Sequence, residues 1–449
     1  MRPPASRLTC WGCGAVPDPA EAYPFRCPHA GAGDVDHVLV RVLDPDRVRF
    51  PEGGVGTRSP FVHYRGLLHS HHRAIAGGVA DDEVVEIVTR LDDAVSTVAG
   101  DGFRATPFGR NDVLSDRLGF SAAGGVWVKD ETGNVSGSHK GRHLMGVLLH
   151  LEVAERLGLA DPGARPDLAI ASCGNAALAA AVVARAADRV LRVFVPVDAD
   201  PVVLQQLHEL GADVVTCARE HGATGDPAYA RLRSALAAGA VPFTCQGNEN
   251  GLVIEGGETL AWEMASDLRA ADIDLDHLVV QVGGGALASA CIQGFEEAVR
   301  LGALTHGPRI HTVQTTGGHP LERAYTRVRA ALPDAPSAAD VQAALHKAAA
   351  HRSAFMWPWE DEPHSIATGI LDDETYDWRA VVGGMLTTGG RPLVSSEECL
   401  ARAHDLGHAA GYAVDPTGSA GLAGLLDLVS AGDVGADDRV GVLFTGVDR

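Results

Sequence analysis

Short runs of β-branched and other apolar residues recur along the chain, and alanine-rich amphipathic stretches alternate with them. The runs are VWVKD (126–130), DLAIAS (167–172), RVFVPV (192–197), ADVVTC (212–217), HLVVQV (277–282), RIHTVQ (309–314) and RVGVLFTG (439–446). Apolar strands that alternate with helices indicate parallel sheets with helices on both faces, because a crossover between parallel strands usually contains a helix. The pattern therefore predicts an α/β protein with doubly wound sheets.

In doubly wound proteins, ligands bind beyond the carboxyl ends of the parallel strands. Three predicted strands end in polar or glycine-rich segments, namely SCGNAA (172–177), GGGALA (283–288) and FTGVDR (444–449). We expect the functional site where these segments meet. Elsewhere, one amphipathic helix is predicted over 81–98, and the less regular segment 320–364 is expected to wrap a domain or border the site.

The composition is that of a globular protein and narrows the choice of partners. With 46% hydrophobic residues in 449 positions, the chain has enough apolar residues for a large core. Its 37 Lys and Arg against 58 Asp and Glu give a formal charge of −21, which repels nucleic acids and anionic membranes. We find no apolar run of about 18 residues, the length that a membrane span requires. We therefore expect a soluble cytoplasmic protein with reduced cysteines and neither nucleic-acid nor membrane partners.

A lysine in the segment NVSGSHKGR (134–142) follows small residues and precedes an apolar helix. Lysine becomes an imine-forming nucleophile where desolvation or a neighbouring cation lowers its pKa, and Arg142, His139 and His143 are candidate neighbours of Lys140. The same segment also fits an ordinary surface lysine. Taken alone, it leaves both interpretations open.

Two further segments fit anion binding at the start of a helix. Glycine in VGGGALASA (282–290) lets backbone N–H groups approach a phosphate closely, although glycine also serves tight turns for steric reasons. This segment lacks the Gly-Lys-Ser/Thr of a nucleotide P-loop. The segment SCGN (172–175) offers donors for a carboxylate or, alternatively, a simple helix N-cap by Ser172 or Asn175.

Together and in this order, the three segments resemble the fold type II pyridoxal 5'-phosphate (PLP) enzymes, the tryptophan synthase β-like superfamily, and within it the threonine synthase and threonine dehydratase branch. The family's Asn-Pro-Thr-Gly-Ser-Phe-Lys block looks like KDETGNVSGSHK (129–140), its asparagine loop like SCGN and its phosphate loop like GGGAL (283–287). Further agreement is found in Thr106-Pro107-Phe108, EGGETLAWE (255–263), VDPTGSAGLAGL (414–425) and Phe444-Thr445-Gly446. The resemblance spans residues 60–449.

The resemblance implies a role for each matching residue. Lys140 would bind PLP as an imine and, once released, move the proton at the substrate's Cα. The other implied PLP contacts are Asn175 at the ring 3'-oxygen, Thr445 at the pyridine nitrogen, and the backbone of Gly283, Gly284, Gly285, Ala286 and Leu287 at the phosphate. The implied substrate contacts are Ser136, Ser172, Cys173 and Gly174. A neutral hydroxyl at the ring nitrogen suits elimination and replacement better than transamination.

The sequence departs from the family pattern close to the lysine and after the asparagine loop. Val135-Ser136 replaces the family's Pro-Thr, His139 replaces the Phe before the lysine, and Gly141 replaces the Asp after it. Ala176-Ala177 stands where threonine synthases commonly carry Thr or Ser that help to bind a phosphorylated substrate. The last difference argues against O-phosphohomoserine as the substrate.

The family fold consists of two doubly wound α/β domains, here preceded by a short Cys-rich ribbon. The ribbon would comprise residues 1–35, the large PLP-binding domain residues 36–135 and 250–449, and the smaller domain residues 136–249 with Lys140 and the asparagine loop. The resemblance also implies a homodimer.

The amino terminus contains CWGC followed by CPH, which supplies soft metal ligands at short spacing. Structural zinc sites take four Cys or His ligands, and the candidates here are Cys10, Cys13, Cys27 and His29. The alternative is a degenerate ribbon that has lost part of its ligands. A second group is expected on a solvated helix face rather than at a metal, namely His63, His69, His71 and His72.

The leading functional hypothesis is a PLP-dependent lyase of the threonine synthase or dehydratase type, which labilises the Cα proton of an amino acid and expels a β or γ substituent. The alternative on the same scaffold is β-replacement, as in cysteine or cysteate synthesis. A hypothesis of another class is a non-catalytic protein that binds PLP or an amino acid, or that binds a macromolecule through a zinc ribbon. Lys140 favours catalysis, and the acidic charge argues against nucleic acid.

Overall fold

The computed structural model describes residues 3–219 and 226–448, which form three sheets. The strands are β1 Ser6–Cys10, β2 Leu39–Leu43, β3 Phe108–Asn111, β4 Gly125–Asp130, β5 Leu168–Ala171, β6 Leu191–Pro196, β7 Asp213–Cys217, β8 Val241–Pro242, β9 His277–Gln281, β10 Arg309–Thr315, β11 Pro392–Ser395 and β12 Arg439–Phe444. A six-stranded sheet has the order β11-β10-β9-β12-β4-β3 and is parallel except for β3. A four-stranded parallel sheet has the order β7-β6-β5-β8, and β1 pairs antiparallel with β2. The predicted α/β class is thereby confirmed.

Helices connect the parallel strands and cover the six-stranded sheet on both faces. The helices are α1 Pro60–His63, α2 His69–Ala76, α3 Asp81–Ala99, α4 Asp112–Leu118, α5 Lys140–Arg156, α6 Asn175–Ala186, α7 Pro201–Glu209, α8 Pro227–Ala237, α9 Val253–Ala271, α10 Ala286–Arg300, α11 Pro320–Arg329, α12 Ala338–Ala349, α13 Trp378–Thr388, α14 Glu397–Ala409 and α15 Ala420–Ala431. Leu278 and Val280 of β9 pack in the core that contains α10, whereas Val279 packs in the core that contains α15. Burial on both faces explains the continuous apolar runs in the sequence.

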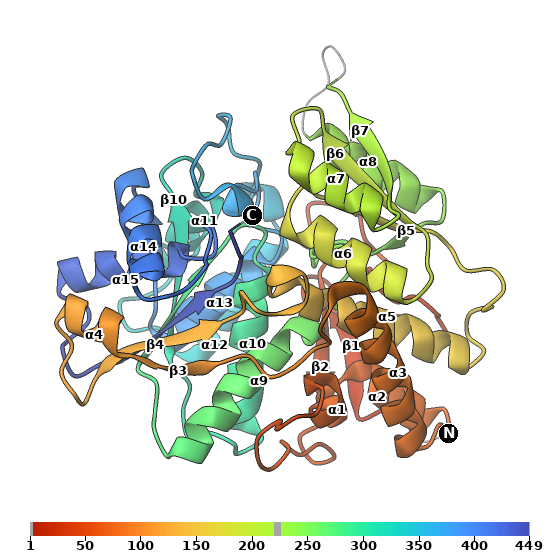
Figure 1. The fold of residues 1–449 in the computed structure, drawn as a ribbon, viewed down its shortest axis with the longest axis horizontal. Helices are drawn as coiled ribbons and strands as arrows, with labels where there is room; N and C mark the ends of the chain where they lie inside the picture. Colours follow the sequence, from red (N-terminus) through yellow and green to blue (C-terminus); the bar gives the residue numbers. More distant parts are fainter. Residues whose placement is uncertain (1–2, 220–225, 449) are drawn as a thin grey trace.

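The two parallel sheets belong to two lobes. Figure 1 shows the four-stranded sheet with α6, α7 and α8 in a lobe apart from the six-stranded sheet. Between them, α5 packs against α6 on one side and α9 on the other, so Lys140 at the start of α5 lies at the border of the lobes. The strands of the four-stranded sheet fall within 168–242, and the domain boundaries at 135 and 250 stay a prediction.

Every predicted apolar run contains a strand, and the predicted helix over 81–98 is α3. The short strands β1, β2, β3, β8 and β11 were not predicted. The segment 320–364 is more regular than expected, because α11 and α12 occupy much of it. The irregular backbone lies further on, where residues 350–377 contain the 3-10 helices η3 Arg352–Ala354 and η4 Thr368–Ile370.

The histidines of the N-terminal part lie inside the fold, so the prediction of a solvated helix face was wrong. His69 and His72 are buried because α2 packs between β1 and α5; His63 on α1 is buried as well, and His71 is half-buried. The Ser6 hydroxyl lies 2.8 Å from His69 Nδ1 and 2.7 Å from His72 Nδ1. Burial lowers the pKa of His72 to about 4. These imidazoles are therefore neutral parts of the core.

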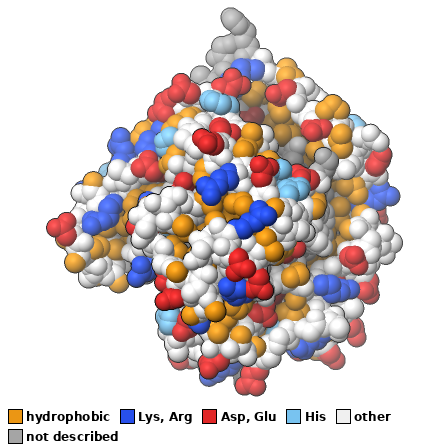
Figure 2. Space-filling model, turned by 60° about the vertical axis from the view of Figure 1, so that its left-hand side comes forward, with side chains coloured by type: hydrophobic (Ala, Val, Ile, Leu, Met, Phe, Trp, Pro, Cys, Tyr) orange, Lys and Arg blue, Asp and Glu red, His pale blue; other side chains and the backbone are white. Residues whose placement is uncertain are grey.

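The surface carries charges of both signs. Acidic, basic and apolar side chains are interspersed over the face shown in Figure 2. Among residues 3–219 and 226–448, no helix combines the length and the apolar character that crossing a bilayer requires.

Candidate active site

Lys140 lies in a cleft of about 400 Å³ between the two lobes. The predicted cofactor and substrate residues that line this cleft are Lys140, Ser172, Cys173, Gly174, Asn175, Gly283, Gly284, Gly285, Ala286, Leu287 and Thr445. Three of the walls begin where β5, β9 and β12 end, as the rule for doubly wound sheets predicts. Three segments that are far apart in the sequence therefore form one site.

The loop before Lys140 is held in an unusual conformation beside the C-terminal segment. Ser136 (φ 58°) and Gly137 (φ 67°) have left-handed backbone conformations, which are rare for a residue such as serine. The N–H of Val447 donates to the carbonyl of Gly137 at 3.1 Å. Ser136 itself lines a neighbouring groove with α6 rather than the cleft, so the structure does not place it with the other predicted substrate contacts.

A buried ion network anchors α5 two residues after Lys140. The Arg142 guanidinium donates to Glu131 (2.8 and 2.9 Å) and to Glu263 (2.6 and 3.0 Å), and Lys129 Nζ lies 2.6 Å from Glu263. All four side chains are at most 1% exposed, and their two positive and two negative charges cancel. Although burial opposes it, Arg142 holds the pKa of Glu131 below its usual value. Arg142 is therefore a positioning residue that ties α5 to β4 and α9.

The two histidines beside Lys140 are neutral. Burial, and next to it the charge of Lys140, lowers the pKa of His143 to about 3 and that of His139 well below its usual value. His143 Nδ1 lies 2.8 Å from the Val253 carbonyl, which fixes that ring. His139 Nδ1 lies 3.4 Å from the Thr445 carbonyl, while its buried Nε2 has no hydrogen-bond partner and lines the cleft. The Nε2 atom of His139 thus offers an unused polar contact to a bound group.

The glycine-rich loop after β9 leaves the N-terminus of α10 accessible from the cleft. Gly285 caps α10 with φ +97°, a conformation that favours glycine. A Cβ at Gly283 would overlap the carboxylate of Asp372, and a Cβ at Gly284 would lie 2.8 Å from the Tyr376 ring. The three glycines are therefore required by close packing, and the free N–H groups at the start of this 15-residue helix suit an anion such as a phosphate.

The hydroxyl of Thr445 is oriented by a residue that the sequence reasoning missed. Gln281, the last residue of β9, donates through Nε2 to the carbonyls of Gly418 (2.9 Å) and Leu443 (3.2 Å) and to Thr445 Oγ1 (2.6 Å). Because carbonyls only accept, Nε2 must be the donor, so Thr445 accepts from Gln281 and keeps its own proton for another partner. A hydroxyl that donates into the cleft matches the pyridine nitrogen of PLP.

The asparagine loop forms the opposite wall. Gly174 caps α6 and Asn175 is its first residue, so the N–H groups of the first helical turn point toward the cleft. The N–H of Gly174 lies 3.5 Å from the Ser172 hydroxyl, which it contacts weakly. A Cβ at Gly446 would lie 2.8 Å from the amide nitrogen of Asn175, which brings Asn175 next to the segment that carries Thr445.

The remaining wall is acidic. Asp226 and Asp372 line the cleft, and Lys140 is the one Lys or Arg among the described residues that do so. Burial raises the pKa of Asp372 to about 6, although Lys140 and the N–H of Gly284 act in the opposite direction. Sequence reasoning missed Asp372 because its place in the cleft depends on how residues 368–377 fold over the glycine-rich loop.

The predicted zinc ligands converge in part. The ligand atoms of Cys10, Cys13, Cys27 and His37 all lie within 4.8 Å of one another, whereas the His29 ring is outside this group, with Nδ1 3.7 Å from Cys13 Sγ. His37 thus joins three of the predicted ligands, and the prediction of His29 as the fourth ligand stays a prediction. Burial raises the pKa of Cys10 to about 12. Although burial opposes it, the backbone N–H of Ala15 and then His29 lower the pKa of Cys13 to about 6.

Comparison with known families matches residues 100–446 to the family described as "Pyridoxal-phosphate dependent enzyme". The chain belongs to this family. The chain is 27% identical over 350 residues to a threonine synthase of Methanosarcina acetivorans, which covers 76% of this chain and 74% of the relative. It is also 31% identical over 178 residues to an L-serine dehydratase of Saccharomyces cerevisiae, which covers 38% of this chain and 51% of the relative.

Solved structures of other PLP enzymes share the fold. The processed form of threonine deaminase isoform 2 from Solanum lycopersicum superposes with a TM-score of 0.58 at 17% identity and covers 83% of this chain and 92% of the other. Diaminopropionate ammonia lyase from Escherichia coli gives a TM-score of 0.56 at 16% identity, with 81% and 88% covered. At these identities the likeness establishes fold type II, as the sequence predicted.

The residues around the cleft fit PLP. Gly283–Leu287 form an open helix N-terminus for the phosphate, Thr445 retains a free hydroxyl proton, and the buried His139 Nε2 lacks a partner. Lys140 completes the set as the amine of the cleft. The donors present are thus those that a phosphorylated aromatic aldehyde requires.

Proposed function

We propose that this protein is a PLP-dependent lyase that removes the Cα proton of an amino acid and expels a substituent from its β or γ carbon. The observation that supports it most is one cleft that contains Lys140, two helix N-termini and the Thr445 hydroxyl. Helix N-termini bind anions, and a PLP enzyme acting on an amino acid has two anions to hold, the cofactor phosphate and the substrate carboxylate. The relatives named threonine synthase and L-serine dehydratase support the same class.

Each residue has a role in this proposal. When bound, PLP supplies an electron sink that stabilises negative charge at the substrate's Cα. Lys140 holds the cofactor and moves the Cα proton, while the N–H groups of residues 172–175 hold the substrate carboxylate. Thr445 donates its hydroxyl to the ring nitrogen, and this neutral partner withdraws less charge than a carboxylate pair would, which favours elimination over transamination. His139 remains neutral beside Lys140 and contacts the bound cofactor through Nε2.

The charge of the cleft favours a substrate without a phosphate. Asp226 and Asp372 repel a second phosphate, and the Lys or Arg that would bind it is missing from the described lining. Ala176 and Ala177 follow Asn175 without a hydroxyl to contribute. We therefore place hydroxy amino acids such as L-serine and L-threonine ahead of O-phosphohomoserine.

A substrate panel tests this proposal. The PLP-loaded protein is incubated separately with L-serine, L-threonine, O-phosphoserine and O-phosphohomoserine, with and without sulfide, and 2-oxo acid, ammonium and phosphate are measured. We expect 2-oxo acid and ammonium from a hydroxy amino acid, and little phosphate release. The Lys140→Ala variant controls for non-enzymatic turnover. The Asp372→Asn variant is expected to narrow the difference between phosphorylated and unphosphorylated substrates.

Each outcome separates the candidate functions. A new amino acid that forms only with sulfide indicates β-replacement, and fast phosphate release from O-phosphohomoserine indicates threonine synthesis. Retained PLP without any product from the panel refutes the lyase proposal in favour of a binding protein. The proposal also includes a cytoplasmic homodimer, tested by sedimentation and fractionation, and a structural Zn²⁺ held by Cys10, Cys13 and Cys27 with one histidine.

A further inference from the structure

Three thiols and one imidazole converge at the end of β1. Cys13 Sγ lies 3.5 Å from Cys27 Sγ, and Cys10 Sγ lies 3.7 Å from His37 Nδ1. Tetrahedral zinc with Zn–S of about 2.3 Å and Zn–N of about 2.0 Å places its ligand atoms roughly 3.5–3.8 Å apart. These two separations match those of a tetrahedral zinc site, and all four ligand atoms lie within 4.8 Å of one another.

The ring of His37 is oriented as a metal-bound histidine would be. Its Nε2 lies 3.1 Å from the carbonyl of Ala32, and a proton donated there leaves Nδ1 unprotonated toward Cys10. Metal-ligating histidines characteristically donate their other ring nitrogen to a carbonyl or carboxylate. The His29 ring is outside the four-residue group, and its Nδ1 lies 3.7 Å from the Cys13 sulfur.

Backbone groups are arranged around the sulfur atoms as thiolate ligands require. The Cys10 sulfur accepts from the N–H groups of Gly12 and Cys13, and the Cys27 sulfur accepts from the N–H of His29 at 3.3 Å. A Cβ at Gly12 would overlap the carbonyl oxygen of Asp36, so only glycine lets this turn pack against the segment that carries His37. The turn thus brings its donors and both parts of the site together.

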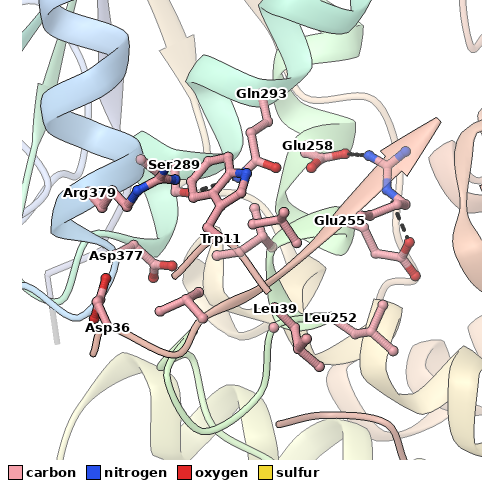
Figure 3. A pocket seen from close by; sticks show the side chains of 16 residues that line it. Trp11, Asp36, Leu39, Leu252, Glu255, Glu258, Ser289, Gln293, Asp377 and Arg379 are labelled. Atoms are coloured by element: carbon pink, nitrogen blue, oxygen red, sulfur yellow. Dashed lines mark hydrogen bonds and ion pairs between the residues drawn. The ribbon is translucent and has the colours of Figure 1, made fainter. Parts of the chain in front are cut away.

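Trp11 and Asp36, which are sequence neighbours of Cys10 and His37, contact residues near the phosphate loop. Trp11 follows Cys10, and its ring lies 4.8 Å from the Arg379 guanidinium carbon; Asp36 precedes His37 and lies 3.4 Å from Arg352. Figure 3 shows Trp11, Asp36, Asp377 and Arg379 around one narrow pocket of about 10 Å³. The N-terminal segment and the start of α13 therefore share one buried contact surface.

The start of α13 in turn supports the phosphate loop. The N–H of Asp377 donates to the Gly284 carbonyl at 3.1 Å, and a Cβ at Gly285 would lie 3.2 Å from the Cβ of Asp377. Any displacement of Asp377 and Arg379 would therefore move the backbone of the loop that faces the cofactor phosphate.

We propose that Zn²⁺ bound by Cys10, Cys13, Cys27 and His37 fixes the N-terminal segment against the start of α13, and that this support raises the affinity for PLP. The inference rests on the proposed PLP site but not on the lyase reaction. Coupling of this kind between neighbouring elements changes affinity by roughly threefold to thirtyfold.

Metal content tests the ligand set. Wild type, His37→Ala, His37→Cys and His29→Ala are purified as full chains, their zinc is measured by mass spectrometry, and Co²⁺ is substituted to record tetrahedral absorption bands. We expect one zinc per chain in wild type and in His29→Ala, and a loss of zinc in His37→Ala. His37→Cys retains the metal with a spectrum shifted toward four-thiolate coordination. Zinc retained by His37→Ala, or lost by His29→Ala alone, overturns the ligand assignment.

PLP titrations without substrate, followed by absorbance, test whether the zinc site raises the affinity for PLP. We expect His37→Ala to bind PLP roughly threefold to thirtyfold more weakly than His29→Ala, with an unchanged far-ultraviolet circular dichroism spectrum. Trp11→Leu separates zinc binding from the support of the PLP site, because this variant should retain zinc and still bind PLP more weakly. Equal PLP affinity in zinc-free and zinc-loaded protein overturns the supporting role. PLP that fails to bind even the zinc-loaded wild type refutes the proposed cofactor site instead, while zinc content still decides the ligand set.

Discussion

Replacing Arg142 by methionine tests whether the buried ion network holds the helix of Lys140 in place. The substitution removes two hydrogen bonds to Glu131 and two to Glu263, while Lys129 still pairs with Glu263. Glu131 is left as a buried carboxylate that has lost its direct ion-pair partner and keeps only Thr106 and Asn134 as hydrogen-bond donors. Hydrogen bonds to charged groups contribute about 1.5–3 kcal/mol each, and breaking one partner of a buried ion pair costs about 3–5 kcal/mol. We expect Arg142→Met to lower the free energy of unfolding by about 3–5 kcal/mol.

Urea unfolding, followed by tryptophan fluorescence and circular dichroism, measures this loss. Arg90→Met is the matched control, because Arg90 also pairs with a glutamate, Glu152, at 2.6 Å but is 61% exposed. An exposed pair of this kind contributes about 0–1 kcal/mol. Adding Glu131→Gln to Arg142→Met removes the orphaned charge and should restore about 1 kcal/mol or more. If Arg142→Met loses no more stability than Arg90→Met, the network does not anchor α5.

Three further predictions concern single groups. Asp372→Asn should tighten the binding of PLP and of inorganic phosphate, because it removes a carboxylate next to the Gly284 N–H. The gain in affinity over wild type should grow as the pH rises through about 6, where Asp372 ionises. Fluorescence titration at several pH values measures this gain. Thr445→Val should weaken PLP binding by about 0.5–1.5 kcal/mol, because it removes the hydroxyl proposed to donate to the ring nitrogen, while Gln281 keeps its two carbonyl acceptors. The titration of a Thr445→Ser variant should remain close to wild type. Burial raises the pKa of Glu255 to about 7 from an unfolded value of about 4.3, so the folded protein binds this proton more tightly than the unfolded chain does. The thermal midpoint should therefore decrease as the pH is raised from 5 to 8, and it should decrease less in Glu255→Gln.

The sequence was most informative where the site consists of contiguous residues. Lys140, the SCGN loop and the GGGAL loop stand directly after strands, and parallel strand ends meet at one edge of a sheet, so their convergence followed from the pattern and from the family resemblance. The strands that were missed are short or at an edge, where an apolar run is too brief to identify them. β8, for example, has two residues.

Residues that depend on tertiary packing were not predictable in this way. Asp372 enters the cleft because an irregular segment folds over the glycine-rich loop, and Gln281 is marked in the sequence only as a polar residue at the end of an apolar strand. His37 was not considered as a ligand because it is separated from the cysteines in the sequence, and only the turn at Gly12, which packs against Asp36, brings it close to them. The four histidines near residue 70 were predicted to be solvated because a charged helix face and a buried polar face have the same spacing.

Identification of the lysine that binds PLP tests the central claim most directly. The chain contains three lysines, of which Lys129 is fully buried in the ion network, Lys347 is exposed on α12 and Lys140 lies in the cleft. The protein is loaded with PLP, reduced with borohydride, digested and mapped by mass spectrometry. We predict one fixed cofactor per chain on Lys140, with Lys347 as the internal control for non-specific labelling. Labelling of Lys347 to the same extent as Lys140, or a protein that retains no PLP, would contradict the assignment of this cleft as the active site.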